Sequence, residues 1–320
     1  MSHTAEKKPG YIWDVQEISD QGERVTHLAP DHVFYGHLSI YHFAFQYVRG
    51  AAILDAGSGS GYGSAYLADS GAKHVTGLEL NARAVEFSRY HFQRPNLDYQ
   101  VMDLGDMHGL PPRHFDLIFS SNTLEHVPGI RNFFHSAWEL LKPGGTLLLA
   151  VPPVTDQRLE YLNLINPYHL HIWSPRQWSE VLQGYFGEVT PYLHGVGEIG
   201  QDFAPEHYGL NKINQQSFAF KPGTLEDMYK SFTLTAIFLA HSPLPEEQIP
   251  APSAPIQFVD GSYSRPAGYI DPQIKHKLRR YFKAGQAKPA NLITRAYAVL
   301  RGKGLGAFLT RIASYPFRKR

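Results

Sequence analysis

A glycine-rich turn is the stretch of this chain whose residue types most clearly suggest chemistry. It follows the apolar run 51–55 and precedes a helix expected over residues 64–70. Glycines let a backbone pass close to a ligand and take conformations that a Cβ forbids. The N–H groups at the start of the next helix point at whatever lies over the turn. The pattern predicts a nucleotide or nucleoside site contacted by Gly57, Ser58, Gly59 and Gly61.

Three carboxylates stand at the ends of successive predicted strands, namely Asp55, Glu79 and Asp103. The carboxyl ends of parallel strands form the edge at which ligands bind in such sheets, so these acids should converge there. Each acid alone has a plainer interpretation as a helix cap or a surface charge. Three acids in this arrangement are much harder to explain in that way.

Each of these acids suits a different part of a nucleoside. Glu79 can accept hydrogen bonds from both ribose hydroxyls, as in dinucleotide folds. Asp103 can receive an adenine amino group while its apolar neighbours, Met102 and Leu104, hold the ring. Asp55 can either orient the turn or hold a ligand ammonium.

Alternating strand and helix signals position these residues. Strands are expected at 51–55, 74–78, 97–102, 115–120, 146–151, 188–193 and 231–240, and helices at 35–49, 64–70, 81–93, 130–141 and 174–185. This alternation predicts a mostly parallel, seven-stranded sheet with helices on both faces. The apolar strand 115–120 is typical of one buried on both faces.

Five segments between about residues 50 and 153 together resemble the ordered motifs of class I S-adenosylmethionine (SAM)-dependent methyltransferases. They are Ile-Leu-Asp-Ala-Gly-Ser-Gly-Ser-Gly (53–61), Gly-Leu-Glu (77–79), Met-Asp-Leu (102–104), Phe-Asp-Leu-Ile with Ser-Asn-Thr-Leu-Glu-His-Val (115–127), and Leu-Lys-Pro-Gly-Gly (141–145). The resemblance implies a Rossmann-like fold, SAM as cofactor and methyltransferase activity.

By the same resemblance, the glycine turn meets the methionine part of SAM, and Asp55 belongs to the cofactor site. Glu79 would take the ribose and Asp103 the adenine amine, and Leu80 and Leu104 also belong to the cofactor site. Asn122 and Leu124 would lie along the open side of the cofactor. A dinucleotide-dependent oxidoreductase is disfavoured, because no Gly-x-Gly-x-x-Gly spacing is present and the Leu-Lys-Pro-Gly-Gly corner is foreign to that class.

Methyl transfer to oxygen usually requires removal of a proton, for which histidine is suited near neutral pH. His126, His169 and His171 follow predicted strands and are the candidate bases, with His169 preferred. Asn-Pro-Tyr-His (166–169) resembles a loop common in glycan-associated family members, although Ile172 stands where an acid is often found. A packing role for His126 remains an equal alternative. His169 and His171 supply no third metal ligand, so no metal site is expected.

Composition excludes several classes of protein and site. The chain of 320 residues has no cysteine, which excludes disulfides, thiolate zinc sites and cysteine nucleophiles. It shows neither an apolar signal core nor an apolar run of about 20 residues. We expect a cytoplasmic protein.

Charge is divided unevenly along the chain. All 29 acidic residues lie at or before Asp271, whereas 13 of the 30 Lys and Arg lie after it. Apolar positions at helical spacing in this C-terminal region predict a basic amphipathic tail at 273–320, typical of a segment that lies on a membrane surface. Docking to a partner protein, packing on the acidic body and simple solvation are alternatives. Nucleic-acid binding is not expected, because no recognition motif is present.

The chain therefore divides into an N-terminal lead (1–50), a methyltransferase domain with acceptor-side insertions (51–241), a proline-rich linker (242–272) and the basic tail (273–320). The preferred acceptor is a sugar hydroxyl of a bacterial surface glycan or lipid-linked precursor, a hypothesis that rests on resemblance. Gly22-Glu23-Arg24 also resembles a subset of the family associated with such glycans. The alternatives are a small-molecule or quinone-like O-methyltransferase at the membrane and a SAM-binding scaffold without activity.

Overall fold

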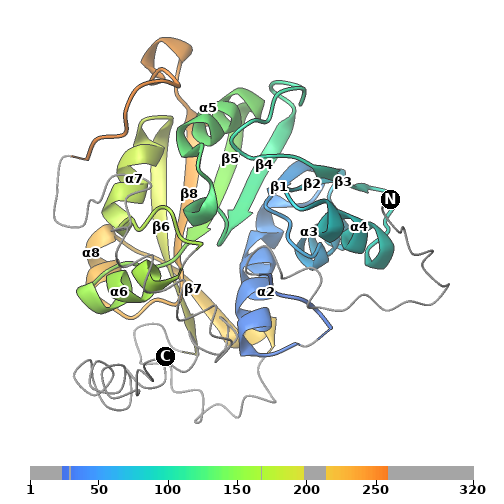
Figure 1. Ribbon diagram of the computed structural model, residues 1–320, viewed down its shortest axis with the longest axis horizontal. Helices are drawn as coiled ribbons and strands as arrows, with labels where there is room; N and C mark the ends of the chain where they lie inside the picture. Colours follow the sequence, from blue (N-terminus) through green and yellow to red (C-terminus); the bar gives the residue numbers. More distant parts are fainter. Residues whose placement is uncertain (1–23, 29, 167, 198–213, 259–320) are drawn as a thin grey trace, which may run out of the picture.

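One eight-stranded sheet runs through the computed structural model, which describes residues 24–28, 30–166, 168–197 and 214–258 (Figure 1). Its strand order is β3-β2-β1-β4-β5-β8-β6-β7. The strands are β1 (Ala52–Ala56), β2 (His74–Glu79), β3 (Leu97–Val101), β4 (Phe115–Ser121), β5 (Leu141–Val151), β6 (Phe186–Val196), β7 (Phe218–Pro222) and β8 (Ala236–Pro243). The first five strands are parallel, and the last three join antiparallel.

Helices cover both faces of this sheet. They are α2 (His32–Ala44), α3 (Tyr62–Asp69), α4 (Ala82–His91), α5 (Ile130–Leu140), α6 (Gln157–Ile165), α7 (Pro175–Gln183) and α8 (Leu225–Lys230). Adjacent residues of β1 show the two faces: Ile53 packs in the cluster with α2 and α3, and Leu54 in the cluster with α5 and α7. The Rossmann-like fold expected from the sequence is confirmed.

The expected number of seven strands was wrong, because β7 adds an eighth. β7 pairs antiparallel with β6 from Val196↔Phe218 to Tyr192↔Pro222. It is a five-residue strand at the edge of the sheet, ending in proline, which sheets tolerate mainly at their edges. Its Phe-Ala-Phe pattern is too short to reveal a strand without the partner that it pairs with.

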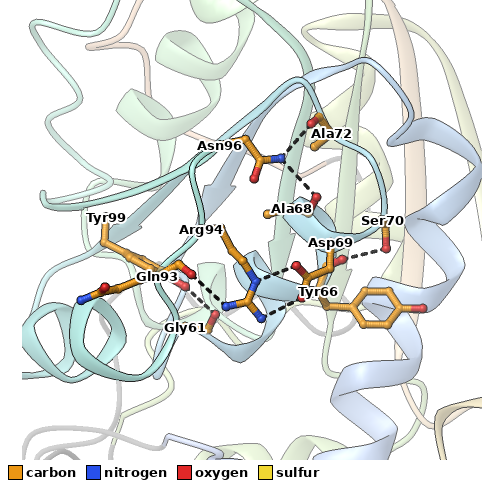
Figure 2. A network of polar contacts seen from close by, with 10 residues as sticks. All are labelled: Gly61, Tyr66, Ala68, Asp69, Ser70, Ala72, Gln93, Arg94, Asn96 and Tyr99. Carbon is orange, nitrogen blue, oxygen red and sulfur yellow. Dashed lines mark hydrogen bonds and ion pairs between the residues drawn. The ribbon is translucent and has the colours of Figure 1, made fainter.

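A polar network links β3 and the segment that precedes it to Gly61 and α3 (Figure 2). The Tyr99 hydroxyl on β3 donates to the Gly61 carbonyl at 2.7 Å. Arg94 makes two hydrogen bonds to Asp69 at the end of α3, of 2.6 and 2.8 Å. Asn96 Nδ2 donates to the carbonyls of Ala68 and Ala72. The Tyr99 bond thus holds the end of the glycine turn, and the bonds of Arg94 and Asn96 hold the C-terminal end of α3 and the residues that follow it.

The described part of the proline-rich segment packs on the domain. The Trp138 indole on α5 donates to the Leu244 carbonyl at 2.7 Å, and Phe258 lies edge-on to Trp173 with ring centroids 5.1 Å apart. The predicted basic tail lies outside the described residues. Within the part of the chain that the structure describes, no helix has the length and apolar character needed to cross a membrane.

Candidate active site

A cavity of about 350 Å³ opens at the carboxyl ends of β1, β2 and β4. Its volume falls in the range usual for small-ligand sites. The predicted site residues that line it are Gly57, Ser58, Gly59, Glu79, Leu80, Asp103, Leu104, Asn122 and His126. Asp55, Gly61, Leu124, His169 and His171 are not among the lining residues. Most of the residues predicted from the sequence thus line the cavity, and the other five lie behind or beside its wall.

The glycine turn has the backbone conformation that its composition suggested. Gly57 and Gly59 have φ values of 92° and 56°, which disfavour any residue with a Cβ. A Cβ on Gly57 would collide with the Thr123 side chain, whereas one on Gly59 would meet no atom within 4 Å. Gly57 is therefore required by close packing, and Gly59 leaves open space above the turn.

Asp55 supports the turn from below. It is fully buried, accepts a hydrogen bond of 2.6 Å from the Ser64 hydroxyl on α3, and lies 3.3 Å from the Tyr41 hydroxyl on α2. Burial raises the pKa of Asp55 to about 7, and the bonds from Ser64 and Tyr41 partly oppose that rise. Of the two roles that the sequence left open, its position fits orientation of the turn.

Glu79 forms an ion pair that the sequence did not predict. Its Oε1 accepts from Arg24 Nη2 at 2.7 Å and from the Asn81 backbone N–H at 2.8 Å. Both side chains are about one-tenth exposed, and both residues line the cavity. Neither contact uses Oε2, so that oxygen is available for a ribose hydroxyl.

Arg24 belongs to a strap, residues 24–28, that lies against the glycine turn. The Ser60 hydroxyl donates to the Val25 carbonyl at 2.6 Å, and His27 packs edge-on against Phe92. The only sequence signal for this contact was the Gly-Glu-Arg resemblance, which said nothing about the partner of Arg24.

The part of the cavity around Asp103 combines one acid with apolar side chains. Asp103 is exposed, and its Oδ1 accepts from the Gly105 N–H at 2.8 Å. Leu104 is buried, while Leu80 is 66% exposed despite lining the cavity. A large apolar side chain in this position is suited to cover the face of a ring.

The chain turns sharply after β4 at Asn122, whose φ of 49° is left-handed. Its N–H donates to the Ala150 carbonyl at 2.8 Å, which fixes the turn to β5. Leu124, fully buried, then starts a 3₁₀ turn over Leu124–His126. Leu124 thus anchors this segment in the core, and His126 reaches the cavity wall.

Of the three candidate bases, only His126 lines the cavity. Its Nδ1 donates to the Tyr168 carbonyl at 3.0 Å, so the neutral ring carries its lone pair on Nε2. His169 is 8% exposed and lies against His126, with ring centroids 4.9 Å apart. His171 is more deeply buried. It donates from Nε2 to the Val127 carbonyl, and burial lowers its pKa.

The residues of the cavity fit SAM on structural grounds. The Ser58 hydroxyl is buried and has no hydrogen-bond partner among the described residues, and the space over Gly59 is open. Two carboxylates, those of Glu79 and Asp103, lie in the wall of the cavity and can accept hydrogen bonds from hydroxyl or amino groups. Together these groups match the polar parts of a nucleoside that carries an amino acid.

Comparison with known proteins agrees with this geometry. Residues 54–149, which span β1 to β5, match the family described as "Methyltransferase domain". The cofactor that this similarity indicates is S-adenosylmethionine, as the sequence predicted. The match covers less than a third of the chain and ends before the loop that carries His169.

Individual relatives share this domain. The chain is 27% identical to a protein of Mycolicibacterium smegmatis named "Probable S-adenosylmethionine-dependent methyltransferase/", over 55% of this chain and 69% of the other. It is 37% identical to "Ubiquinone biosynthesis O-methyltransferase" of Xanthomonas campestris over 103 residues, 32% of this chain and less than half (43%) of that protein. A SAM-dependent methyltransferase structure from Archaeoglobus fulgidus covers 64% of this chain and 92% of its own, at 16% identity and a TM-score of 0.48.

Proposed function

We propose that this protein is a SAM-dependent methyltransferase that acts on a hydroxyl group. The observation that carries the proposal is the cavity itself, which brings the glycine turn, Glu79, Asp103 and His126 together within the matched domain. SAM supplies a methyl group on a sulfonium when it is bound. Everything else in the reaction depends on how the chain positions the acceptor and removes its proton.

The proposed roles follow from position. The glycine turn holds the amino-acid part of the cofactor, Glu79 the ribose and Asp103 the adenine amine. The acceptor oxygen approaches from the His126 side, where an imidazole Nε2 with a lone pair can accept the hydroxyl proton. As that proton leaves, the oxygen–methyl bond forms and the sulfur–methyl bond breaks. Orientation of the two reactants supplies much of the acceleration.

The acceptor that we propose first is a sugar hydroxyl of a bacterial surface glycan or a lipid-linked precursor. The support is the resemblance of Gly22-Glu23-Arg24 and of the loop 166–169 to glycan-associated family members. Two residues of those motifs, Arg24 and Tyr168, line the cavity. A tyrosine at the wall offers a ring face on which a sugar can stack.

A phenolic hydroxyl of a quinone-like molecule is the second candidate. The specific observation in its favour is the 37% identity to the Xanthomonas protein, which is named a ubiquinone biosynthesis O-methyltransferase. That identity covers about a third (32%) of this chain and less than half (43%) of the Xanthomonas protein.

Mass spectrometry of surface glycans and of lipid extracts from a deletion strain separates these candidates. Loss of one methyl group from a glycan, restored by the wild-type gene and not by a His126→Ala variant, is the expected result. Loss from a quinone precursor alone would favour the second candidate. An unchanged inventory from a strain whose purified protein still binds SAM would favour a scaffold without activity.

The basic tail is proposed to hold the protein at an anionic membrane surface, with docking to a partner protein as the alternative. Flotation of the full chain and of a chain lacking residues 273–320 with anionic vesicles tests this. Equal flotation of the two proteins would contradict a membrane role for the tail.

A further inference from the structure

Three side chains behind the cavity wall offer ligand atoms to a common point. Glu125, His126 and His169 each place one carboxylate oxygen or ring nitrogen within 4.8 Å of the other two. Glu125 is 1% exposed, and its Oε2 has no hydrogen-bond partner among the described residues. Its other oxygen, Oε1, lies 3.8 Å from His126 Nε2. A buried carboxylate oxygen without a partner is costly unless something else binds it.

Hydrogen bonds fix the tautomer of both histidines. The Tyr168 carbonyl can only accept, so His126 Nδ1 carries the proton at that 3.0 Å contact. Asn163 Oδ1 lies 2.7 Å from His169 Nδ1, and Asn163 Nδ2 donates to the Leu159 carbonyl, which fixes the amide orientation. Each ring therefore has its lone pair on Nε2. Metal-bound histidines typically donate their other N–H to a carbonyl in this way.

The backbone ties these ligands together. The carbonyl of Glu125 accepts from the N–H groups of Leu170 and His171 at 2.7 and 3.0 Å. The loop that carries His169 is thus bonded directly to the 3₁₀ turn that carries Glu125 and His126. This connection positions the three ligands before any ion binds.

We propose that Glu125, His126 and His169 bind a divalent transition-metal ion beside the cofactor cavity. Two imidazoles and one carboxylate suit Zn²⁺ and also Fe²⁺, Co²⁺ or Mn²⁺, and three protein ligands leave coordination positions open. His126 lines the cavity, so an open position would face the acceptor. No third ligand for His169 and His171 was predicted from the sequence. In the folded chain Glu125 lies beside His126 and His169, and His126 takes the place of His171.

The role of this ion in the reaction rests on the proposed function. An acceptor hydroxyl on the ion loses its proton more readily, because the metal stabilises the alkoxide. The proton leaves to solvent, the oxygen takes the methyl group, and the sulfur–methyl bond breaks. His126 then acts as a ligand in the loaded enzyme. The competing explanation is that Glu125 pairs with a protonated His126 and no ion is held.

Metal titration of the full chain, without an affinity tag and after chelator treatment, tests the site directly. Co²⁺ is the spectroscopic probe, because its visible bands report coordination, and Zn²⁺ content is measured by elemental mass spectrometry after dialysis. We expect one ion per chain. Glu125→Gln and His169→Ala should each weaken binding at least about tenfold.

His135→Ala is the matched control. His135 is 26% exposed at its side chain, as His126 is, and lies 3.9 Å from Glu139, but it belongs to no three-ligand cluster among the described residues. Its loss should leave the Co²⁺ bands unchanged. If the buried variants do not fold, His126→Ala, at a partly exposed position, tests the same site.

The outcomes separate this proposal from the proposed function. A wild-type chain that takes up no Co²⁺, or variants that bind it as the control does, would overturn the metal site. Full methyl transfer by the chelated protein would also overturn its role. Co²⁺ bound at these residues in a protein that transfers no methyl group would leave the site standing and refute the function.

Discussion

Removal of the Arg24 side chain should weaken cofactor binding through Glu79. Arg24 Nη2 supplies one of the two hydrogen bonds to Glu79 Oε1, at 2.7 Å, and both partners are about one-tenth exposed. Without it, the carboxylate loses its fixed orientation, and its charge is left poorly compensated at the cavity wall. We therefore expect Arg24→Ala to bind SAM less tightly.

The size of this effect follows from the single contact that is lost. A hydrogen bond to a charged group contributes about 1.5–3 kcal/mol. Each 1.4 kcal/mol corresponds to a factor of ten in affinity, so the Kd for SAM should rise about 10- to 100-fold. The strap keeps its other contacts, through Ser60 and Phe92, so the fold should survive.

Isothermal titration calorimetry with SAM measures this directly. Lys142→Ala is the matched control, because it removes the cation of a second ion pair, 2.7 Å from Asp116, in which both partners are more than one-third exposed. A Glu79→Gln background should abolish most of the Arg24→Ala effect if the two residues act together. An Arg24→Ala variant that binds SAM within twofold of wild type would contradict this prediction. Tighter binding would also contradict it, and would indicate that Arg24 competes with the ribose for the Glu79 carboxylate.

Three further predictions concern the turn and the candidate base. Gly57→Ala should lower the free energy of unfolding by about 1–3 kcal/mol and weaken SAM binding, because the φ of Gly57 is 92° and an added Cβ would meet the Thr123 side chain. The control Gly50→Ala, at a φ of 73° with open space around the added Cβ, should leave the affinity for SAM unchanged. Equal losses of SAM affinity in the two variants would contradict the role of close packing at Gly57. The raised pKa of Asp55 means that the folded state holds a proton more tightly than the unfolded state between about pH 4 and 7, so stability from this group is present at low pH and is lost as pH rises through 7. Urea unfolding of Asp55→Asn, compared with wild type across this interval, should show the variant gaining relative stability as pH rises; a pH-independent difference would be inconsistent with a buried, protonating carboxyl. His126→Ala should slow methyl transfer by about 10²- to 10⁴-fold with little change in SAM affinity. Single-turnover kinetics measures the rate, and calorimetry measures the affinity. An unchanged rate would show that His126 takes no part in the reaction.

That the predicted cofactor-binding residues lie together could be predicted from the sequence, because each is close along the chain to the strand that carries it. The turn at 57–61 follows β1, Glu79 ends β2, and Asp103 follows β3, so strand order alone brings them to one edge. Their spacing along the chain therefore predicts that they lie together. The first five strands and their helices could be predicted in the same way.

Residues that meet through long connections could not be predicted. Arg24 reaches Glu79 across 55 positions, and no local pattern specifies that pairing. The role of Glu125 likewise depends on a distant segment, because its carbonyl accepts hydrogen bonds from the N–H groups of Leu170 and His171. β7 likewise depends on β6 for its identity as a strand. His171, two positions from His169, is directed to the Val127 carbonyl, so its prediction as a base has no support from its position.

The central claim is that the cavity over the glycine turn binds SAM. Calorimetric titration of the full chain with SAM, beside Glu79→Gln and Gly59→Phe variants, tests it most directly. Gly59→Phe would extend a ring into space that holds no protein atom within 4 Å of the added Cβ. We predict one SAM bound per wild-type chain, with affinity reduced at least about tenfold by either substitution. Absence of binding, or binding that neither substitution affects, would contradict it.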